Sequence, residues 1–571
     1  MAEPTIQLGG GNWAGKTDNL LGYYKEGERF YKQDFTFSRS TTGTYTDKDG
    51  YIQEMPYNLL EQSNTFDQWS DTTIVLTSGQ SGYDGSNDAW LMAKNGSDSR
   101  IFMGVTTSDV TTTSIYAKAN ASDYLRLRID TTNATTNTYF NLANGSVHST
   151  NYSIDTNIES VGNGWYRCSV TPRDTATIVR LYPAEAGTTS ATSGSIYIQN
   201  AQLVKGTSAK TYFPTTTRLN MPRVSYLNNS NGSLILEPQR SNLITYSSDF
   251  SEWAIDSKSS IISNSIISPD GTLNATKLIA GSTSGRQAIQ INASATGNLV
   301  FSTYAKKGEY SVVQLTDAVD SSLYANFDLE NGTLGSYNNC TPTIIDVENG
   351  WYRCVIVWSS ASNINKVRTS IAETTTQGRL VSFSGNGTDG IYVWGAQLEQ
   401  GSYPTSIINT IGSSVTRNAD SCILTNVADR IGQTEGTMFI EFDTALGFTQ
   451  QMNLINFNNS TQASVLISKR TDGKLNARVW ANGSAPVSII SEATLGKTKA
   501  AFSYKSGDSV LCVNGVLFTN SVAFSFNGDL TELKFPSNEA YFNYGNKYSV
   551  SQAKLYNTRL SNSELQELTT L

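Results

Sequence analysis

Histidine is almost absent from the sequence, which holds a single one, His148, among 571 residues. Catalytic Ser-His-Asp and Cys-His groups and most zinc sites need an imidazole, so the sequence argues against these classes of site. Cysteine is also scarce: five residues, an odd number without CxxC spacing, predict neither a disulfide framework nor a zinc site. No apolar run approaches the roughly 18 residues of a membrane span. We therefore expect no membrane insertion.

Charge is also limited, because only 16% of the residues are charged and acidic residues outnumber basic ones by 49 to 41. The net charge of −8 has the wrong sign for a protein that binds a nucleic-acid backbone, so nucleic acid is not an expected partner. No glycine motif for phosphate or dinucleotide follows an apolar strand, and no cofactor is expected. Glycine (45 residues) and aromatic residues (10%) are abundant, a mixture typical of turn-rich β proteins.

The chain contains an internal repeat, visible as landmarks that recur in the same order. The first copy begins with NLL at 58–60 and continues through SIYAKA and VGNGWYRCSV to SIYIQNAQL. The second begins with NLI at 242–244 and continues through STYAKKG and VENGWYRCVI to GIYVWGAQL. Eight or so shared landmarks in one order indicate duplication. We interpret residues 58–217 and 242–412 as two copies of one domain, joined by a connector over 218–241.

Within each copy, segments such as TTSIYAKA and DYLRLRID alternate apolar and polar residues between turn signals. This alternation predicts antiparallel strands with one buried face, and the number of short segments favours a double-sheet jelly roll. Residues 413–571 have the same pattern, except that Ser561 and Glu564 predict a capping box on a short terminal helix. The predicted fold class is all-β: tandem antiparallel β-sandwich (jelly-roll) domains after an irregular N-terminal attachment arm over 1–57. The first twenty residues have low hydrophobicity, and we expect them to form an extended arm that orders only against a partner.

The NGWYRC motif follows an Asn-Gly turn in both copies. Its Trp165, Cys168, Trp351 and Cys354 fall where the interior of a sheet needs bulk, and we interpret them as core residues. His148 stands in the polar stretch NGSVHSTN, which predicts a solvated loop residue.

A sugar-binding surface needs exposed aromatic rings next to planar hydrogen-bonding groups. In NDAWLMAK, alternation puts Trp90 and Met92 on one face of a strand and Ala89 and Leu91 on the other. If the Trp90 face is the outer one, Trp90 suits a ligand or subunit contact. A tryptophan packed on a flank of the domain is the alternative.

Arginines supply further candidates for sugar binding. In YLRLRI, Arg126 and Arg128 alternate with apolar residues, which sends both to the polar face of a strand, where they could clamp an acidic sugar. Arg100 and Arg286 hold matching places in the two copies, where they could bind a ligand or tie strands together. Trp480, beside a turn in NARVWANG, is the candidate aromatic of the last domain, with an edge-strand aromatic as the alternative.

Metal-binding and catalytic residues are not predicted. Asp- and Asn-rich turns at 83–90 and 385–390 could supply oxygen ligands to calcium, but neither matches a calcium loop, and turn chemistry explains them. Acidic residues fall singly in turns, so no carboxylate pair of a glycosidase stands out. We expect a chain that is not an enzyme, with a polysaccharide depolymerase as the less favoured alternative.

The motifs NLL-QSN-F-W, S-YAKA, NGWYRC, Y-NAQL and RSTTGTY-DKDG resemble the repeated carbohydrate-binding-like modules of bacteriophage tail fibres, tailspikes and head fibres. The resemblance covers most of residues 35–410, and residues 413–571 resemble a concanavalin-A-like or laminin-G-like jelly roll. It implies a structural virion protein, made in bacterial cytoplasm, that presents glycan-binding modules for adhesion to host-surface glycans. It also implies a homotrimer whose arm binds other virion proteins of the capsid or tail. A passive decoration role, as a head fibre, collar or tail connector, is the alternative.

Overall fold

The computed structural model describes residues 3–10, 24–26, 29–31, 36–39, 41–55, 58–107, 110–215, 222–227, 231–318, 320, 322–444, 451–458, 463–526, 528–535 and 548–571. The chain forms two compact units, and each is described by itself. Unit 1 comprises Met1–Tyr24, Lys32–Met55 and Met221–Leu571, and unit 2 comprises Lys25–Tyr31 and Pro56–Asn220. Among the residues just given, no helix is long and apolar enough to cross a membrane.

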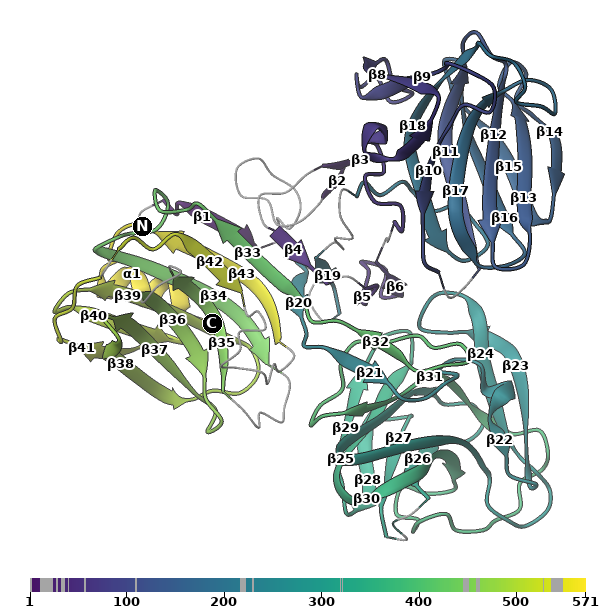
Figure 1. The fold of residues 1–571 in the computed structure, drawn as a ribbon. Helices are drawn as coiled ribbons and strands as arrows, with labels where there is room; N and C mark the ends of the chain where they lie inside the picture. The colour runs from purple at the N-terminus through teal and green to yellow at the C-terminus, as the bar shows by residue number, and fades with distance from the viewer. Residues whose placement is uncertain are drawn as a thin grey trace. The chain divides into compact units, whose positions relative to one another are not determined.

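Unit 2 contains a β-sandwich of two antiparallel sheets (Figure 1), with the strand orders β14-β13-β12-β17-β10-β7 and β15-β16-β11-β18-β9-β8. Along β12, Leu125, Leu127 and Ile129 point into the core, and the polar residues between them point outward. The period-two pattern therefore predicted these strands correctly. The strands are β7 (Ser70–Thr72), β8 (Ile74–Gln80), β9 (Ala89–Lys94), β10 (Arg100–Gly104), β11 (Thr111–Ala119), β12 (Tyr124–Thr131), β13 (Thr135–Asn141), β14 (Ser146–Asn151), β15 (Ser153–Gly162), β16 (Trp165–Pro172), β17 (Ala176–Ala184) and β18 (Ser195–Lys205).

The second copy of the repeat forms a similar sandwich, within unit 1. Two of its strands, β25 and β30, are long and pair with each other on both sides of the register shifts at 292–297. Each of them replaces two strands of unit 2, so the orders β28-β27-β26-β30-β25-β22 and β29-β30-β25-β31-β24-β23 match the two sheets there. The strands are β22 (Ala254–Ile255), β23 (Ser259–Ile267), β24 (Leu273–Ala280), β25 (Ala288–Lys306), β26 (Val312–Asp317), β27 (Tyr324–Asp328), β28 (Thr333–Asn338), β29 (Thr341–Asp346), β30 (Tyr352–Ala372) and β31 (Gly390–Gln400).

A buried asparagine explains why the NLL and AQL motifs recur together. Asn58 Nδ2 donates hydrogen bonds of 3.0 Å to the carbonyls of Ala201 and Phe213, and its Oδ1 accepts from the amides of Leu60 and Leu203. All four hydrogen-bonding positions of this amide are filled, as a buried polar group requires. In the second copy Asn242 makes the same four bonds, to the backbone of Ala396, Ile408, Ile244 and Leu398. The motif thus ties the start of each sandwich to its closing strand.

The NGWYRC motif contributes to the core in both copies, which confirms the prediction. Trp165 and Trp351 are 2% and 1% exposed, and Cys168 and Cys354 are fully buried. Burial raises the pKa of both thiols, so they are held as neutral apolar groups. His148 is exposed, as expected, but it lies on the strand β14 rather than in a loop.

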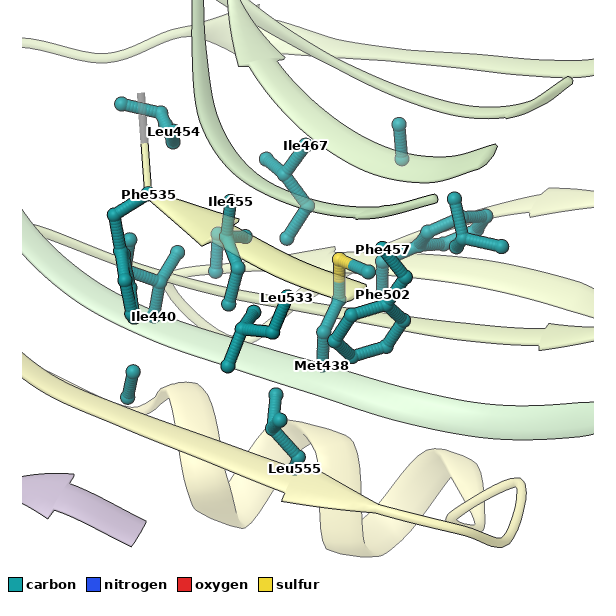
Figure 2. Packing of buried hydrophobic residues seen from close by; sticks show 14 of the residues in the cluster. Met438, Ile440, Leu454, Ile455, Phe457, Ile467, Phe502, Leu533, Phe535 and Leu555 are labelled. Carbon is teal, nitrogen blue, oxygen red and sulfur yellow. The ribbon is translucent and has the colours of Figure 1, made fainter. Parts of the chain in front are cut away.

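The C-terminal sandwich, also in unit 1, has one sheet with the order β19-β20-β43-β34-β39-β40-β41, with β1 beside β43, and another with the order β38-β37-β36-β35-β42-β33-β4. Figure 2 shows its core, where Met438, Ile440 and Phe502 of the first sheet meet Ile455 and Phe457 of the second. The all-β tandem-sandwich fold class is confirmed. The strands are β1 (Ile6–Gly9), β4 (Thr36–Ser38), β19 (Arg223–Ser225), β20 (Ser233–Leu236), β33 (Ser421–Thr425), β34 (Glu435–Thr444), β35 (Met452–Asn458), β36 (Ser464–Lys469), β37 (Lys474–Ala481), β38 (Ser484–Ala493), β39 (Thr498–Lys505), β40 (Ser509–Val513), β41 (Val516–Asn520), β42 (Glu532–Phe535) and β43 (Tyr548–Tyr556).

Residues 3–10 of the N-terminal arm are ordered against the chain itself, contrary to the prediction that the first twenty residues order only against a partner. Strand β1 pairs with β43, and β4 pairs with β33, so both belong to the C-terminal sandwich. An edge strand offers unpaired N–H and C=O groups, and these two segments bind them. The residues of the arm that lie outside the described ones are 1–2, 11–23, 27–28, 32–35, 40 and 56–57. Three separate two-stranded sheets are also present: β2 (Tyr24–Glu26) with β3 (Arg29–Tyr31), β5 (Thr44–Thr46) with β6 (Ile52–Glu54), and β21 (Arg240–Asn242) with β32 (Val415–Arg417).

Five buried charged residues of unit 1 form an ionic cluster, made of Arg39, Arg223, Glu237, Arg417 and Asp420. Asp420 binds Arg39 at 2.8 Å and Arg223 at 2.5 Å, while Glu237 binds Arg223 at 2.9 Å and Arg417 at 2.8 Å. Burial lowers the pKa of Arg39 to about 10. Burial also acts to lower the pKa of Arg223, but the carboxylates of Asp420 and Glu237 have the larger effect, and the pKa of Arg223 is raised. The cluster joins the N-terminal segment, the connector and the start of the C-terminal sandwich.

The predicted terminal helix is present as α1 (Asn562–Thr569), and the capping box is confirmed. Ser561 Oγ accepts a hydrogen bond from the backbone amide of Glu564, whose side chain accepts one from the backbone amide of Ser561. The helix packs Leu565 and Leu568 against a small apolar cluster that includes Val510.

Removal of the Ser561 hydroxyl is expected to weaken this helix modestly. We expect Ser561→Ala to lower the free energy of unfolding by about 1 kcal/mol, because one amide of the first turn loses its acceptor. Hydrogen exchange at the α1 amides of the full chain would measure the change. Unaltered protection in Ser561→Ala would show that packing of Leu565 and Leu568 alone holds the helix.

Candidate functional site

The outward side of the sheet β14-β13-β12-β17-β10-β7 of unit 2 carries a group of arginine and aromatic side chains, named here the arginine face. Alternation along the strands sets their direction, because the residues between them fill the core. The register then brings the strands' side chains together: Arg126 lies opposite Tyr139 on one side and Tyr182 on the other. The arginine face consists of Arg100, Phe102, Arg126, Arg128, Asp130, Asn137, Tyr139, Arg180 and Tyr182.

Arg126 stands at the centre of the arginine face. Its Nε and Nη2 donate to Asn137 Oδ1 at 3.1 and 2.6 Å. Its guanidinium carbon lies 4.7 Å from the ring centre of Tyr182 and 5.6 Å from that of Tyr139. The two hydrogen bonds to one amide oxygen and the two cation–π contacts fix the orientation of the guanidinium in the absence of a ligand.

Arg128 and Arg180 face each other across β12 and β17 and share Asp130, with nitrogen–oxygen distances of 2.7 Å to each arginine. Burial alone would raise the pKa of Asp130, but the hydrogen bonds from Arg128 and Arg180 outweigh it and lower that pKa. The Arg128 side chain is 32% exposed and that of Arg180 17% exposed, so solvent reaches the pair.

Two aromatic contacts complete the arginine face. The Arg100 guanidinium lies 5.9 Å from the ring centre of Tyr182, and that of Arg180 lies 5.1 Å from the ring centre of Phe102. Tyr182 is fully covered, whereas Tyr139 and Phe102 are partly exposed. The surface therefore offers flat apolar rings beside planar donors, the two kinds of group that sugar recognition requires.

In the second sandwich the equivalent face is covered by the chain itself. The paired strands place Gln314, Asn326 and Ser370 where unit 2 has Arg126, Tyr139 and Tyr182. Gln314 Nε2 donates to the carbonyl of Gly378 at 3.0 Å, and its Oε1 accepts from the amide of Leu380 at 2.7 Å. Asn326 Nδ2 donates to two carbonyls of the same loop, at 375 and 377. The loop at 373–381 thus occupies the surface that is open in unit 2.

The structure brings three of the predicted binding residues together, Arg100, Arg126 and Arg128, and leaves the other three apart. Arg286 forms an ion pair with Asp256 at 3.2 Å in the second sandwich. Trp480 lies on β37 of the C-terminal sandwich and is 40% exposed. Binding by any of these residues stays a prediction.

Trp90 does not lie on the outer side of its strand, which corrects its choice as a sugar-binding candidate and agrees with the other interpretation, a packed tryptophan. It is 9% exposed, its ring meets that of Phe66 edge-on at 6.3 Å, and its Nε1 donates to the carbonyl of Asn64 at 3.0 Å. Alternation grouped Trp90 with Met92 correctly, but this pair faces the core. The residue pattern of β9 is apolar on both faces, so it did not show which one is inside.

Sequence reasoning missed the aromatic and amide partners of the arginines: Phe102, Asn137, Tyr139 and Tyr182. The sequence held one signal for Tyr182. The segment ATIVRLYPA alternates polar and apolar residues as YLRLRI does, and this alternation puts Arg180 and Tyr182 on the same face of a strand. The register sets Tyr182 beside Arg126 although the two residues are 56 positions apart in the sequence, and no single segment shows it.

Metal binding is not assigned to the turn at 83–90. Asp84 and Asp88 both accept from Ser86 Oγ and from Gln199 Nε2, so the bonding of the turn accounts for their positions. Among the described residues, no group of three or more His, Cys, Asp or Glu side chains is arranged to hold a metal ion.

Loss of the Asp130 charge is expected to remove an acid-sensitive part of the stability of unit 2. A carboxyl whose folded pKa lies below its unfolded value, about 3.9, stabilises the fold above that value. The contribution is lost as the pH falls through the folded pKa. Melting temperatures of the wild-type chain and Asp130→Asn should therefore differ most near pH 7 and converge as the pH falls below about 4. A gap that stays constant with pH would contradict this role.

No protein-family model matches the chain, and no curated protein matches it at a significant level. Among solved structures, it is similar to the IT-sialidase CBM40 of Ruminococcus gnavus bound to α2,3-sialyllactose, at 16% identity over 24% of this chain and 84% of that one, with a TM-score of 0.22. It is also similar to the CBM22-1–CBM22-2 tandem domain of Xyn10C from Paenibacillus barcinonensis, at 12% identity over 60% of this chain and 98% of that one, with a TM-score of 0.18. Identities this low concern the fold alone.

A third similar structure is the sialidase of Trypanosoma rangeli in complex with the inhibitor DANA. It is 10% identical over 94% of this chain and 98% of that one, with a TM-score of 0.22. Because a sialidase is an enzyme, this finding contradicts the prediction of a chain that is not an enzyme. We withdraw that prediction.

Proposed function

We propose that the chain is a carbohydrate-binding adhesion protein and that the arginine face of unit 2 contacts the sugar. The observation that carries the proposal is the open arrangement of Tyr139, Phe102 and Arg126 on one sheet. Partly exposed rings pack against the C–H faces of sugar rings, and the planar Arg126 and Asn137 groups pair with neighbouring hydroxyls.

The resemblance of the sequence motifs to bacteriophage fibre modules supports a setting for this binding. We propose a virion fibre or spike that presents unit 2 to host-surface glycans, acts as a homotrimer, and is attached to other virion proteins through its N-terminal region. A weak contact per chain would be strengthened in such an assembly, because linked sites act at high effective concentration.

Binding of the full-length chain to an array of bacterial surface polysaccharides tests the proposal. We expect the wild type to bind at least one glycan and Tyr139→Ala to bind it at least tenfold more weakly. Tyr337→Ala is the matched control, because Tyr337 is an exposed tyrosine of the second sandwich and should not affect binding. A wild-type chain that binds no glycan, or equal binding by Tyr139→Ala, would overturn the proposal.

A further inference from the structure

We infer that the sugar recognised by the arginine face carries carboxylate groups, that is, an acidic polysaccharide. The inference rests on the proposed function and adds the chemical class of the ligand. It starts from a charge imbalance: the arginine face has four guanidinium groups, of Arg100, Arg126, Arg128 and Arg180, and one carboxylate, of Asp130. This local excess of positive charge lies on a chain whose net charge is −8.

Two of the four arginines have no carboxylate of their own. Arg126 binds only the neutral amide oxygen of Asn137, and Arg100 Nη1 binds the backbone carbonyl of Asp98 at 3.1 Å. Among the described residues, no carboxylate lies within ion-pair distance of Arg126 or Arg100. Two more carboxylates, of Asp98 and Glu185, lie near Tyr139. Asp98 accepts a hydrogen bond from Thr189, and Glu185 pairs with Lys94 at 2.7 Å. These two cations are therefore available for an anionic ligand.

Donor groups on Arg126 also remain unused. Its Nε and Nη2 donate to Asn137, and its Nη1 has no partner among the described residues. A guanidinium binds a carboxylate through two parallel hydrogen bonds, and this geometry distinguishes a carboxylate from a hydroxyl. The cation–π contact with Tyr182, at 4.7 Å, and the hydrogen bonds to Asn137 hold the Arg126 guanidinium in place for such a contact.

In the second sandwich, neutral side chains replace two of these four arginines. Where unit 2 has Arg126 and Arg128, the second sandwich has Gln314 and Thr316, and both are buried within an intact sheet. There the neutral amide of Gln314 binds the neutral backbone of the loop at 373–381. The same loop places Arg379 beside Thr316, with its Nε donating to Thr316 Oγ1 at 3.0 Å, so this face of the second sandwich is closed by groups of the chain itself.

A comparison of acidic polysaccharides with their carboxyl-reduced forms tests the inference. The probes are polygalacturonate, alginate, hyaluronan and colominic acid, each with its carboxyl groups reduced to alcohols, together with neutral bacterial polysaccharides. The full-length chain should bind at least one native acidic probe, at least tenfold more tightly than its reduced form. Arg126→Gln should lose this preference, and Arg470→Gln, an exposed arginine of the C-terminal sandwich, should keep it. Circular dichroism and the melting temperature verify that Arg126→Gln is folded.

The outcomes separate the inference from the proposed function. Equal binding of native and reduced probes, or binding of neutral polysaccharides alone, would overturn the inference and leave sugar binding intact. Preserved preference in a folded Arg126→Gln chain would also overturn it. Failure to bind any polysaccharide, acidic or neutral, would overturn the proposed function and the inference with it.

Discussion

Replacement of Asp420 by asparagine is expected to lower the free energy of unfolding of unit 1 by about 3–5 kcal/mol. Asp420 neutralises Arg39 and Arg223, and all three side chains are fully buried. Asparagine keeps the size of the side chain but not its charge. The cluster would then hold three buried guanidinium groups, of Arg39, Arg223 and Arg417, and only the carboxylate of Glu237. A buried charge without compensation strongly destabilises a fold.

Scanning calorimetry of the full chain would measure this change as a lower melting temperature. Asp472→Asn is the matched control, because Asp472 pairs with Arg470 on the surface, and it should leave the transition unchanged. The double variant Arg39→Met/Asp420→Asn should be more stable than Asp420→Asn, because it removes one of the two stranded cations. Similar melting temperatures for Asp420→Asn and Asp472→Asn would show that the ionic cluster is not a main support of unit 1.

Replacement of Asn58 by alanine is expected to destabilise unit 2 by at least about 3 kcal/mol. The amide of Asn58 has four backbone partners, and in the variant these buried groups have no partner and no access to water. Each buried polar group left without a hydrogen bond costs about 1–3 kcal/mol. Partial relaxation of the chain would reduce the total, so the expected value lies below the sum.

Hydrogen exchange with mass spectrometry would locate the effect, because the amides of Leu60 and Leu203 lose their acceptor in Asn58→Ala. Asn242→Ala should do the same in the second sandwich and leave unit 2 unaffected. Asn144→Ala, in an exposed turn, is the control and should change neither. Wild-type protection at Leu60 and Leu203 in Asn58→Ala would contradict the role of the motif.

Patterns within single segments predicted most of the fold. Alternation in YLRLRI gave the inner and outer faces of β12, and the Ser561–Glu564 spacing gave the cap of α1. These features depend on residues close together in the chain, where the period of a strand or the geometry of a first helical turn is decisive. The repeated landmarks indicated that the two copies share one architecture, and their strand orders coincide.

Features that depend on distant segments were not predictable in the same way. The pairing of β1 with β43 joins opposite ends of the chain, and β1 alone looks like part of an irregular arm. Trp90 shows a second limit, since a strand with two apolar faces does not reveal which one meets the core. For the arginine face, Arg126 was identified from its strand, but Tyr139 and Tyr182 were not, because their place beside it is set by register.

The self-covered face of the second sandwich bears on valency. Because the loop at 373–381 fills the surface that unit 2 leaves open, the duplication does not double the number of such surfaces per chain. Under the proposed function, the count of sugar contacts in an assembly would then follow the number of chains and not the number of sandwiches. Avidity would then be set by the number of chains that assemble.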